Sequence, residues 1–129
     1  MLGAPAILVV EDEAFIALDL ALAVEDAGGR VVGPAASIAE ALTLLTSCEV
    51  DGAVLDVNLP DGDITSVVEQ LVANDVPFVI QTGIGLPDAL AGRFPDLVVS
   101  IKPVLATVLV HRLEALMADR RRQPQSALL

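Results

Sequence analysis

The sequence predicts an α/β domain with a five-stranded parallel sheet and helices on both of its faces. Short apolar runs alternate five times with segments of helical periodicity along the 129 residues, and such alternation implies parallel strands with right-handed crossovers. Hydrophobic residues make up 54% of the chain and charged residues 19%, which is enough to form one core. We therefore expect one domain over 1–121 and a frayed tail over 122–129.

The expected strands are the apolar runs 6–10, 30–35, the run that ends at Asp56, 77–82 and 97–101. A helix opened by Glu11, Asp12 and Glu13 is expected to run to about residue 27, where Gly28 and Gly29 stop it. Ser37 can cap a helix over 38–46, with Glu40 at the position of a capping box. Three further helices are expected at about 64–73, 87–92 and 104–121.

Composition excludes several classes of function. The net charge is -11 and aromatic residues make up 2% of the chain, so neither a basic face nor a base-stacking platform for nucleic acid can be built. No apolar run is long enough to span a membrane and no signal peptide is present, so we expect a cytoplasmic protein. Cys48 is the only cysteine, and we expect it to be a small buried residue.

The third strand ends at an acid, Asp56, and Pro60-Asp61-Gly62 then forces a turn. Ligands of open parallel sheets bind beyond the carboxyl ends of the strands. Asp56 is therefore either a residue that caps the turn or a site residue, and its neighbours at the other strand ends bear on the choice.

Five polar residues are expected at this edge of the sheet: Glu11, Asp12, Asp56, Thr82 and Lys102. If the first and third strands are neighbours, three carboxylates converge and repel one another unless a cation lies between them. Oxygen ligands at an open edge suit Mg²⁺, whereas the chain has no cluster of Cys and His for zinc.

Lys102 is the only lysine in the chain, and an apolar strand delivers it to this edge. An ammonium beside a carboxylate and a hydroxyl can receive an anion with several oxygens, of which a phosphoryl group is the obvious candidate. Asp56 would then be the nucleophile, Mg²⁺ and Lys102 would neutralise the transferring group, and Thr82 would donate a hydrogen bond to it. Taken singly, Lys102 could be a surface lysine and Thr82 an ordinary strand-end residue.

Four segments together resemble the receiver domain of bacterial two-component response regulators over about 6–117. They are Val9-Val10-Glu11-Asp12-Glu13, the stretch 55–62, Thr82-Gly83 and Lys102-Pro103. The resemblance implies the flavodoxin-like receiver fold with strand order 2-1-3-4-5. It also implies that Asp56 is the phosphoacceptor, Asp12 a direct metal ligand, Glu11 a ligand through water, Asn58 a ligand through its carbonyl, Thr82 the switch hydroxyl and Lys102 the invariant lysine.

The sequence departs from the family's pattern on the fifth strand, where Val98, Val99 and Ser100 occupy the region that usually carries Tyr or Phe. The usual coupling, in which the threonine moves and the aromatic ring swings inward, cannot operate as such. The stretch 77–85 is also similar to a stand-alone subgroup with a Phe-Ala-Thr-Gly-Tyr-Gly signature, although Ile80, Gln81 and Ile84 replace its Phe, Ala and Tyr.

We expect a single-domain response regulator, not a turnover enzyme. A histidine kinase or a phosphotransfer protein would donate the phosphoryl group, and output would pass to an unidentified downstream protein or end in a phosphate sink. One alternative is a receiver-fold interaction or dimerisation module that works without phosphorylation. Another is a phosphatase of the haloacid-dehalogenase type, which would require an acid where this chain has Asn58.

The last expected helix has apolar residues over more than one face. Leu105, Leu109, Leu113 and Leu116 form the expected core stripe, and Val104, Val108, Val110 and Met117 extend it. The wider surface either packs against the first helix or forms a contact with a second copy or a partner protein. His111 is expected to be an exposed helix residue and not a phosphotransfer histidine.

Overall fold

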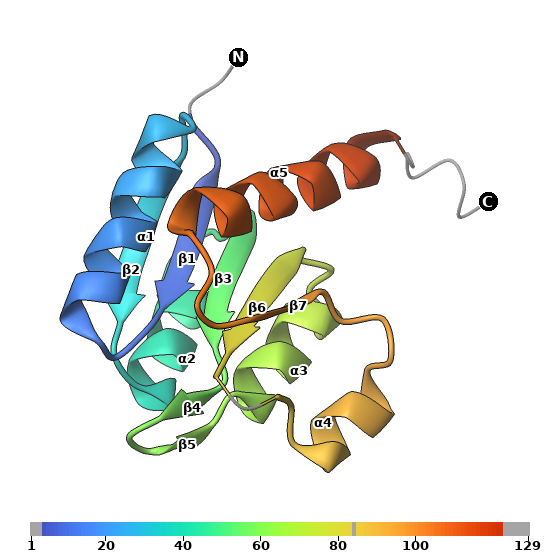
Figure 1. Ribbon diagram of the computed structural model, residues 1–129. Helices are drawn as coiled ribbons and strands as arrows, with labels where there is room; N and C mark the ends of the chain where they lie inside the picture. Colours follow the sequence, from blue (N-terminus) through green and yellow to red (C-terminus); the bar gives the residue numbers. More distant parts are fainter. Residues whose placement is uncertain (1–3, 84, 123–129) are drawn as a thin grey trace.

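The computed structural model of the protein describes residues 4–83 and 85–122, and these form a three-layer α/β domain (Figure 1). The central sheet contains the parallel strands β1 (Ala6–Val10), β2 (Arg30–Ala35), β3 (Gly52–Asp56), β6 (Phe78–Thr82) and β7 (Val99–Ile101). Their order is β2-β1-β3-β6-β7, which confirms the expected order 2-1-3-4-5. The acids that follow β1 and end β3 therefore lie on neighbouring strands.

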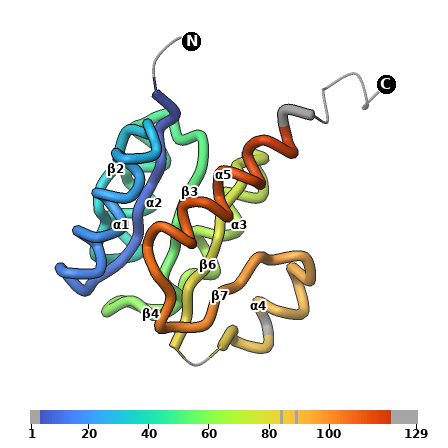
Figure 2. Tube along the Cα trace, turned by 45° about the horizontal axis from the view of Figure 1, so that its top comes forward, coloured from blue at the N-terminus to red at the C-terminus, as the bar shows by residue number. Residues whose placement is uncertain are grey.

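Helices cover both faces of the sheet, with α1 (Ala14–Asp26) and α5 (Ala106–Arg122) in front and α2 (Ile38–Ser47) and α3 (Thr65–Ala73) behind it in Figure 1. The short helix α4 (Asp88–Arg93) stands at the edge of the molecule, near β7 (Figure 2). Crossover connections of this kind keep both faces of a parallel sheet out of water.

The apolar strands form two cores because successive side chains point to opposite faces. Leu8, Leu55 and Ile80 belong to the core on the side of α2 and α3. Val9, Val54 and Val79 belong to the core on the side of α1 and α5. Every residue of β1 and β3 is buried, so the strands that carry the acids have little freedom to move.

A small antiparallel hairpin follows β3, formed by β4 (Asn58–Leu59) and β5 (Gly62–Asp63). The sequence predicted only a turn at this point. The carboxylate of Asp61, at the tip, accepts hydrogen bonds from the backbone amides of Ile38 at 2.8 Å and Ala39 at 3.1 Å. These contacts fasten the hairpin to the amino end of α2, where backbone amides lack partners within the helix.

The capping prediction for α2 is confirmed, because the Ser37 hydroxyl accepts a hydrogen bond from the Glu40 amide at 3.1 Å. The expected acidic first turn of α1 is wrong: the helix begins at Ala14, after the three acids. The expectation that Cys48 is buried is wrong: it is exposed at the carboxyl-terminal cap of α2.

Helix α5 buries Leu109, Val110 and Leu113 in the core shared with α1, so these residues of the wide apolar surface pack inside the domain. Leu105 was expected in the same stripe but precedes the helix and is 71% exposed. His111 is exposed, as expected. The expected tail falls mostly on 123–129, outside the described residues, and the helix itself extends to Arg122. Within the described part of the chain, no helix combines the length and the apolar character needed to cross a bilayer.

Candidate phosphoryl-acceptor site

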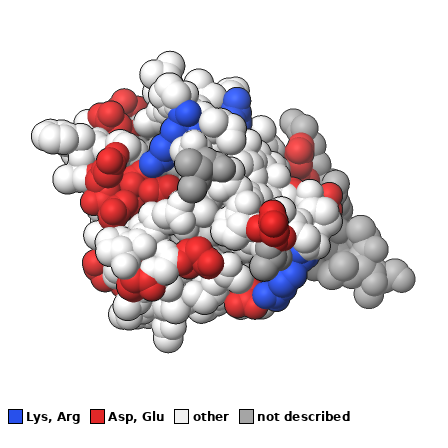
Figure 3. All heavy atoms as spheres, turned by 60° about the horizontal axis from the view of Figure 1, so that its bottom comes forward, with Lys and Arg blue, Asp and Glu red and all other residues white. Residues whose placement is uncertain are grey.

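The predicted site residues come together at the carboxyl edge of the sheet. Glu11 follows β1, Asp56 ends β3, Thr82 ends β6 and Lys102 follows β7. A view with this edge turned forward shows acidic side chains gathered beside a basic group (Figure 3). Because parallel strands all end at the same side, short apolar strands are sufficient to bring these distant residues together.

The acids form one cluster. Glu11, Asp12 and Asp56 each offer a carboxylate oxygen, and these oxygens lie within 4.8 Å of one another. Glu11 is 1% exposed and Asp56 is 7% exposed, whereas Asp12 is exposed and borders solvent. Buried oxygen ligands with one open side suit Mg²⁺, which usually keeps several of its waters. The donor set therefore fits the metal that the sequence predicted.

Asn58 is exposed and lies two residues beyond Asp56, in β4. Its expected contribution is a backbone carbonyl, and that contribution stays a prediction.

Lys102 supplies the positive charge at this edge. Its Nζ lies 3.4 Å from Oδ2 of Asp56 and 3.5 Å from Oε1 of Glu11. Burial lowers the pKa of Lys102, but the negative charges of Asp56 and Glu11 outweigh this effect and raise the pKa above its ordinary value. The side chain is therefore a permanent cation shared by two carboxylates. The peptide bond between Lys102 and Pro103 is cis.

Glu11 carries the clearest electrostatic signature of the site. Burial and, after it, the neighbouring Asp56 raise its pKa from 4.5 to about 7, against the opposing effects of the Glu13 amide and Lys102. Two carboxyl groups at this distance cannot both ionise at low cost without a cation. The site therefore favours binding either a proton or a metal ion.

Gln81 also contacts this cluster, and sequence reasoning did not assign it a role in the site. It is 2% exposed, and its Nε2 donates a hydrogen bond of 2.9 Å to Oε1 of Glu11. The signal that could have found it is a polar amide inside the otherwise apolar segment of β6, because a buried amide requires a partner.

Asp56 and Thr82, which we expected to be the nucleophile and a hydrogen-bond donor, have different partners. Oδ1 of Asp56 accepts a hydrogen bond from the Val57 amide at 2.8 Å, and Oδ2 faces Lys102. The buried hydroxyl of Thr82 donates to the Gly85 carbonyl at 3.0 Å and accepts from the Gly85 amide at 3.1 Å. Thr82 therefore lies at the predicted edge with its hydroxyl bonded to the loop that follows it.

The region of β7 that usually carries an aromatic residue is occupied differently. Val99 is half-buried, and Ser100 is buried with its hydroxyl in contact with the guanidinium of Arg112 on α5. This part of the strand therefore offers a small apolar side chain and a hydroxyl, with no ring to move inward.

No protein-family model matches the chain, and no curated protein does. Solved structures do match. A response regulator receiver protein from Sinorhizobium medicae WSM419 is 27% identical over 93% of this chain and 99% of its own, with a TM-score of 0.81. The receiver domain of HemR from Leptospira biflexa is 32% identical over 88% and 94%, with a TM-score of 0.74. SdrG from Sphingomonas melonis Fr1 is 38% identical over 92% and 99%, also with a TM-score of 0.74.

Proposed function

The chain belongs to the receiver-domain family of response regulators, and we propose that it accepts a phosphoryl group on Asp56 from a histidine kinase or a phosphotransfer protein. The observation that carries the proposal is the placement of Asp56 between one cation and two further acids. Lys102 lies 3.4 Å away, and Glu11 and Asp12 complete a set of oxygens that fits Mg²⁺.

In the proposed reaction a carboxylate oxygen of Asp56 attacks the phosphorus of a phosphohistidine. A P–O bond forms while the P–N bond breaks, and the electron pair of that bond leaves with the imidazole. Lys102 would bind a phosphoryl oxygen, since its ammonium already faces Oδ2 of Asp56. Preorganised charge of this kind stabilises the developing transition state.

Asp12 and Asp56 would hold Mg²⁺ directly, with Glu11 acting through water and Asn58 through its carbonyl. The ion supplies charge neutralisation at the transferring group. The raised pKa of Glu11 supports this assignment, because burial and the neighbouring Asp56 both disfavour its ionised form, and a bound cation would favour that form.

A protein phosphodonor is supported by an apolar stripe on the outer face of α1. Phe15, Leu18 and Leu22 are 86%, 54% and 49% exposed, and their spacing places them on one side of the helix. The stripe begins four residues after Glu11, so a partner docked there would bind the helix that directly follows the acids of the site. Contiguous exposed apolar side chains often mark protein contacts.

Signalling would begin at Thr82. A phosphoryl group on Asp56 would compete with Gly85 for the threonine hydroxyl, shift the loop after Thr82 and alter the surface near α4. That surface would then bind a downstream protein or a second copy, or the chain would serve as a phosphate sink without turnover activity. A BeF3-activated conformation has been determined for SdrG from Pseudomonas melonis Fr1, which is 39% identical to this chain, and BeF3 imitates a phosphoryl group.

A second candidate is an interaction module that works without phosphorylation. It is favoured by Val99 in the place of the usual aromatic residue. The intact group of Asp12, Asp56 and Lys102 favours the phosphoacceptor instead.

Mass spectrometry after incubation with acetyl phosphate and Mg²⁺ separates the two candidates. The phosphoacceptor gains the mass of one phosphoryl group, and Asp56→Asn gains none. An unchanged mass of the wild type, or a gain that survives in Asp56→Asn, would defeat the proposal in favour of the module.

A further inference from the structure

We propose that Gln81 is a positioning residue that holds Glu11 in the geometry required for Mg²⁺ binding. This inference rests on the proposed phosphoryl transfer and assigns a residue that the resemblance leaves without a role. Gln81 would influence Mg²⁺ binding only through Glu11, and it touches no reacting atom itself.

The sheet places Gln81 directly beside the acids. It pairs in register with Asp56 on the neighbouring strand β3, and its side chain reaches Glu11 past that strand with a hydrogen bond of 2.9 Å. Both side chains of the bond are buried. A hydrogen bond to a buried carboxylate is stronger than one between neutral groups, because little water competes for it.

Among the described residues, three nitrogen groups lie against the Glu11 carboxylate beside Asp56, and the amide of Gln81 is the nearest of the three. The Glu13 amide donates to Oε2 at 3.3 Å, and Lys102 lies 3.5 Å from Oε1. Lys102 is also shared with Asp56. Once a phosphoryl group recruits the ammonium, Gln81 is the side chain that keeps Oε1 of Glu11 in place.

Lys102 borders open space on the side of the site where Gln81 lies. A cavity of about 390 Å³ opens between α1 and the segment after β7, and both Gln81 and Lys102 line it. The side chain of Lys102 is 26% exposed, whereas Gln81 is buried and bonded to Glu11. The hydrogen bond from Gln81 therefore keeps Glu11 in place when Lys102 moves toward a phosphoryl group.

The test is an NMR titration of the full chain with Mg²⁺, without a phosphodonor. Gln81→Met has similar volume and removes the amide, and we expect it to lower Mg²⁺ affinity about tenfold or more, as partners of metal ligands commonly do. Ser100→Ala is the matched control: Ser100 is the buried polar neighbour of Gln81 on β7, and its loss should leave Mg²⁺ affinity unchanged.

A double-mutant cycle distinguishes positioning from a general effect on folding. In the Glu11→Gln background, Gln81→Met should lower Mg²⁺ affinity no further, because the group it positions is already changed. Gln81→Asn, which keeps the donor on a shorter chain, provides a second folded variant and should bind Mg²⁺ more tightly than Gln81→Met.

Wild-type affinity in Gln81→Met, or an equal loss in both backgrounds, would overturn this inference and leave the phosphoacceptor standing. A wild-type chain whose spectrum does not respond to Mg²⁺ would overturn the metal-dependent function together with the inference.

Discussion

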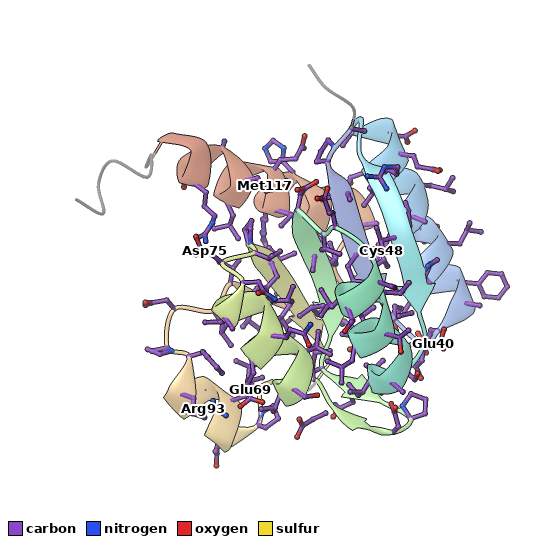
Figure 4. The ribbon with its side chains drawn as sticks, turned by 180° about the vertical axis from the view of Figure 1, so that it is seen from behind. Glu40, Cys48, Glu69, Asp75, Arg93 and Met117 are labelled. Atoms are coloured by element: carbon purple, nitrogen blue, oxygen red, sulfur yellow. The ribbon has the colours of Figure 1, made fainter. Side chains whose placement is uncertain are left out.

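The carboxyl edge of the sheet and the α4 segment are built in opposite ways. At the edge, Glu11, Gln81 and Lys102 form polar contacts that join the ends of β1, β6 and β7. In contrast, α4 is six residues long and is joined to α3 by an ion pair of 2.7 Å between Arg93 and Glu69 (Figure 4). Both side chains of that pair are about half exposed.

The two regions are therefore suited to different roles. A site for phosphoryl transfer gains from groups that are already in place, because no free energy is then spent on moving them during the reaction. A segment that reports the reaction must be able to move, and exposed ion pairs and short helices open at low cost.

Removing the ammonium of Lys102 should have the largest effect on phosphorylation at the carboxyl edge of the sheet. We expect Lys102→Ala to slow phosphorylation of Asp56 by acetyl phosphate about 100-fold or more, as loss of a preorganised electrostatic group commonly does. The rate is followed by mass spectrometry. Arg93→Gln removes a distant cation and serves as control with a nearly unchanged rate. Equal rates for wild type and Lys102→Ala would show that the edge does not work through this ammonium.

The pH dependence of Mg²⁺ binding should follow Glu11. Its pKa is raised from 4.5 to about 7 in the folded protein, so a proton competes with the ion below that pH. We expect Mg²⁺ affinity measured by NMR to rise roughly tenfold between about pH 6 and pH 8. Glu11→Gln should flatten this dependence.

The same shift has a defined sign for stability without metal. Because the pKa of Glu11 is higher in the folded than in the unfolded chain, its contribution to the free energy of unfolding is present below pH 4.5 and is lost as the pH rises through about 7. Relative to Glu11→Gln, the wild type should therefore lose stability over this window in urea titrations. A constant difference between the two proteins would contradict the assignment.

The smallest effect is expected at α4. Breaking the exposed pair with Arg93→Gln should lower the free energy of opening α4 by about 0.2–1 kcal/mol, seen as faster hydrogen exchange of its amides. Glu69→Gln should have the same effect, and the double variant should add little to either. Exchange of amides in β1 and β3 should not change. Slow exchange of α4 in all these variants would remove the contrast between the two regions.

Residues that follow directly from strand ends could be predicted from the sequence. Glu11, Asp12, Asp56 and Lys102 come together as expected, since each adjoins an apolar run and parallel strands end at one edge. The boundaries of β1 and β2 agree with the expected ones, because the runs are flanked by charge and glycine. The strand order came from the family resemblance.

Features that depend on contacts across the chain could not be predicted. The strands β4 and β5 are two residues long, which is too short for a periodicity to show. Asp61 binds the amino end of α2 from 22 and 23 positions away, and a local pattern contains no sign of such a partner. Gln81 was visible as a polar residue in an apolar strand, but only the fold shows that its partner is Glu11.

If Asp56 receives a phosphoryl group between a metal ion and Lys102, a crystal structure with Mg²⁺ and beryllofluoride should show that arrangement. We expect beryllium bonded to a carboxylate oxygen of Asp56, Mg²⁺ bound by Asp12 and Asp56, and Nζ of Lys102 within hydrogen-bond distance of a fluoride. Beryllofluoride bonded to another carboxylate, or a site that takes up neither group, would contradict it.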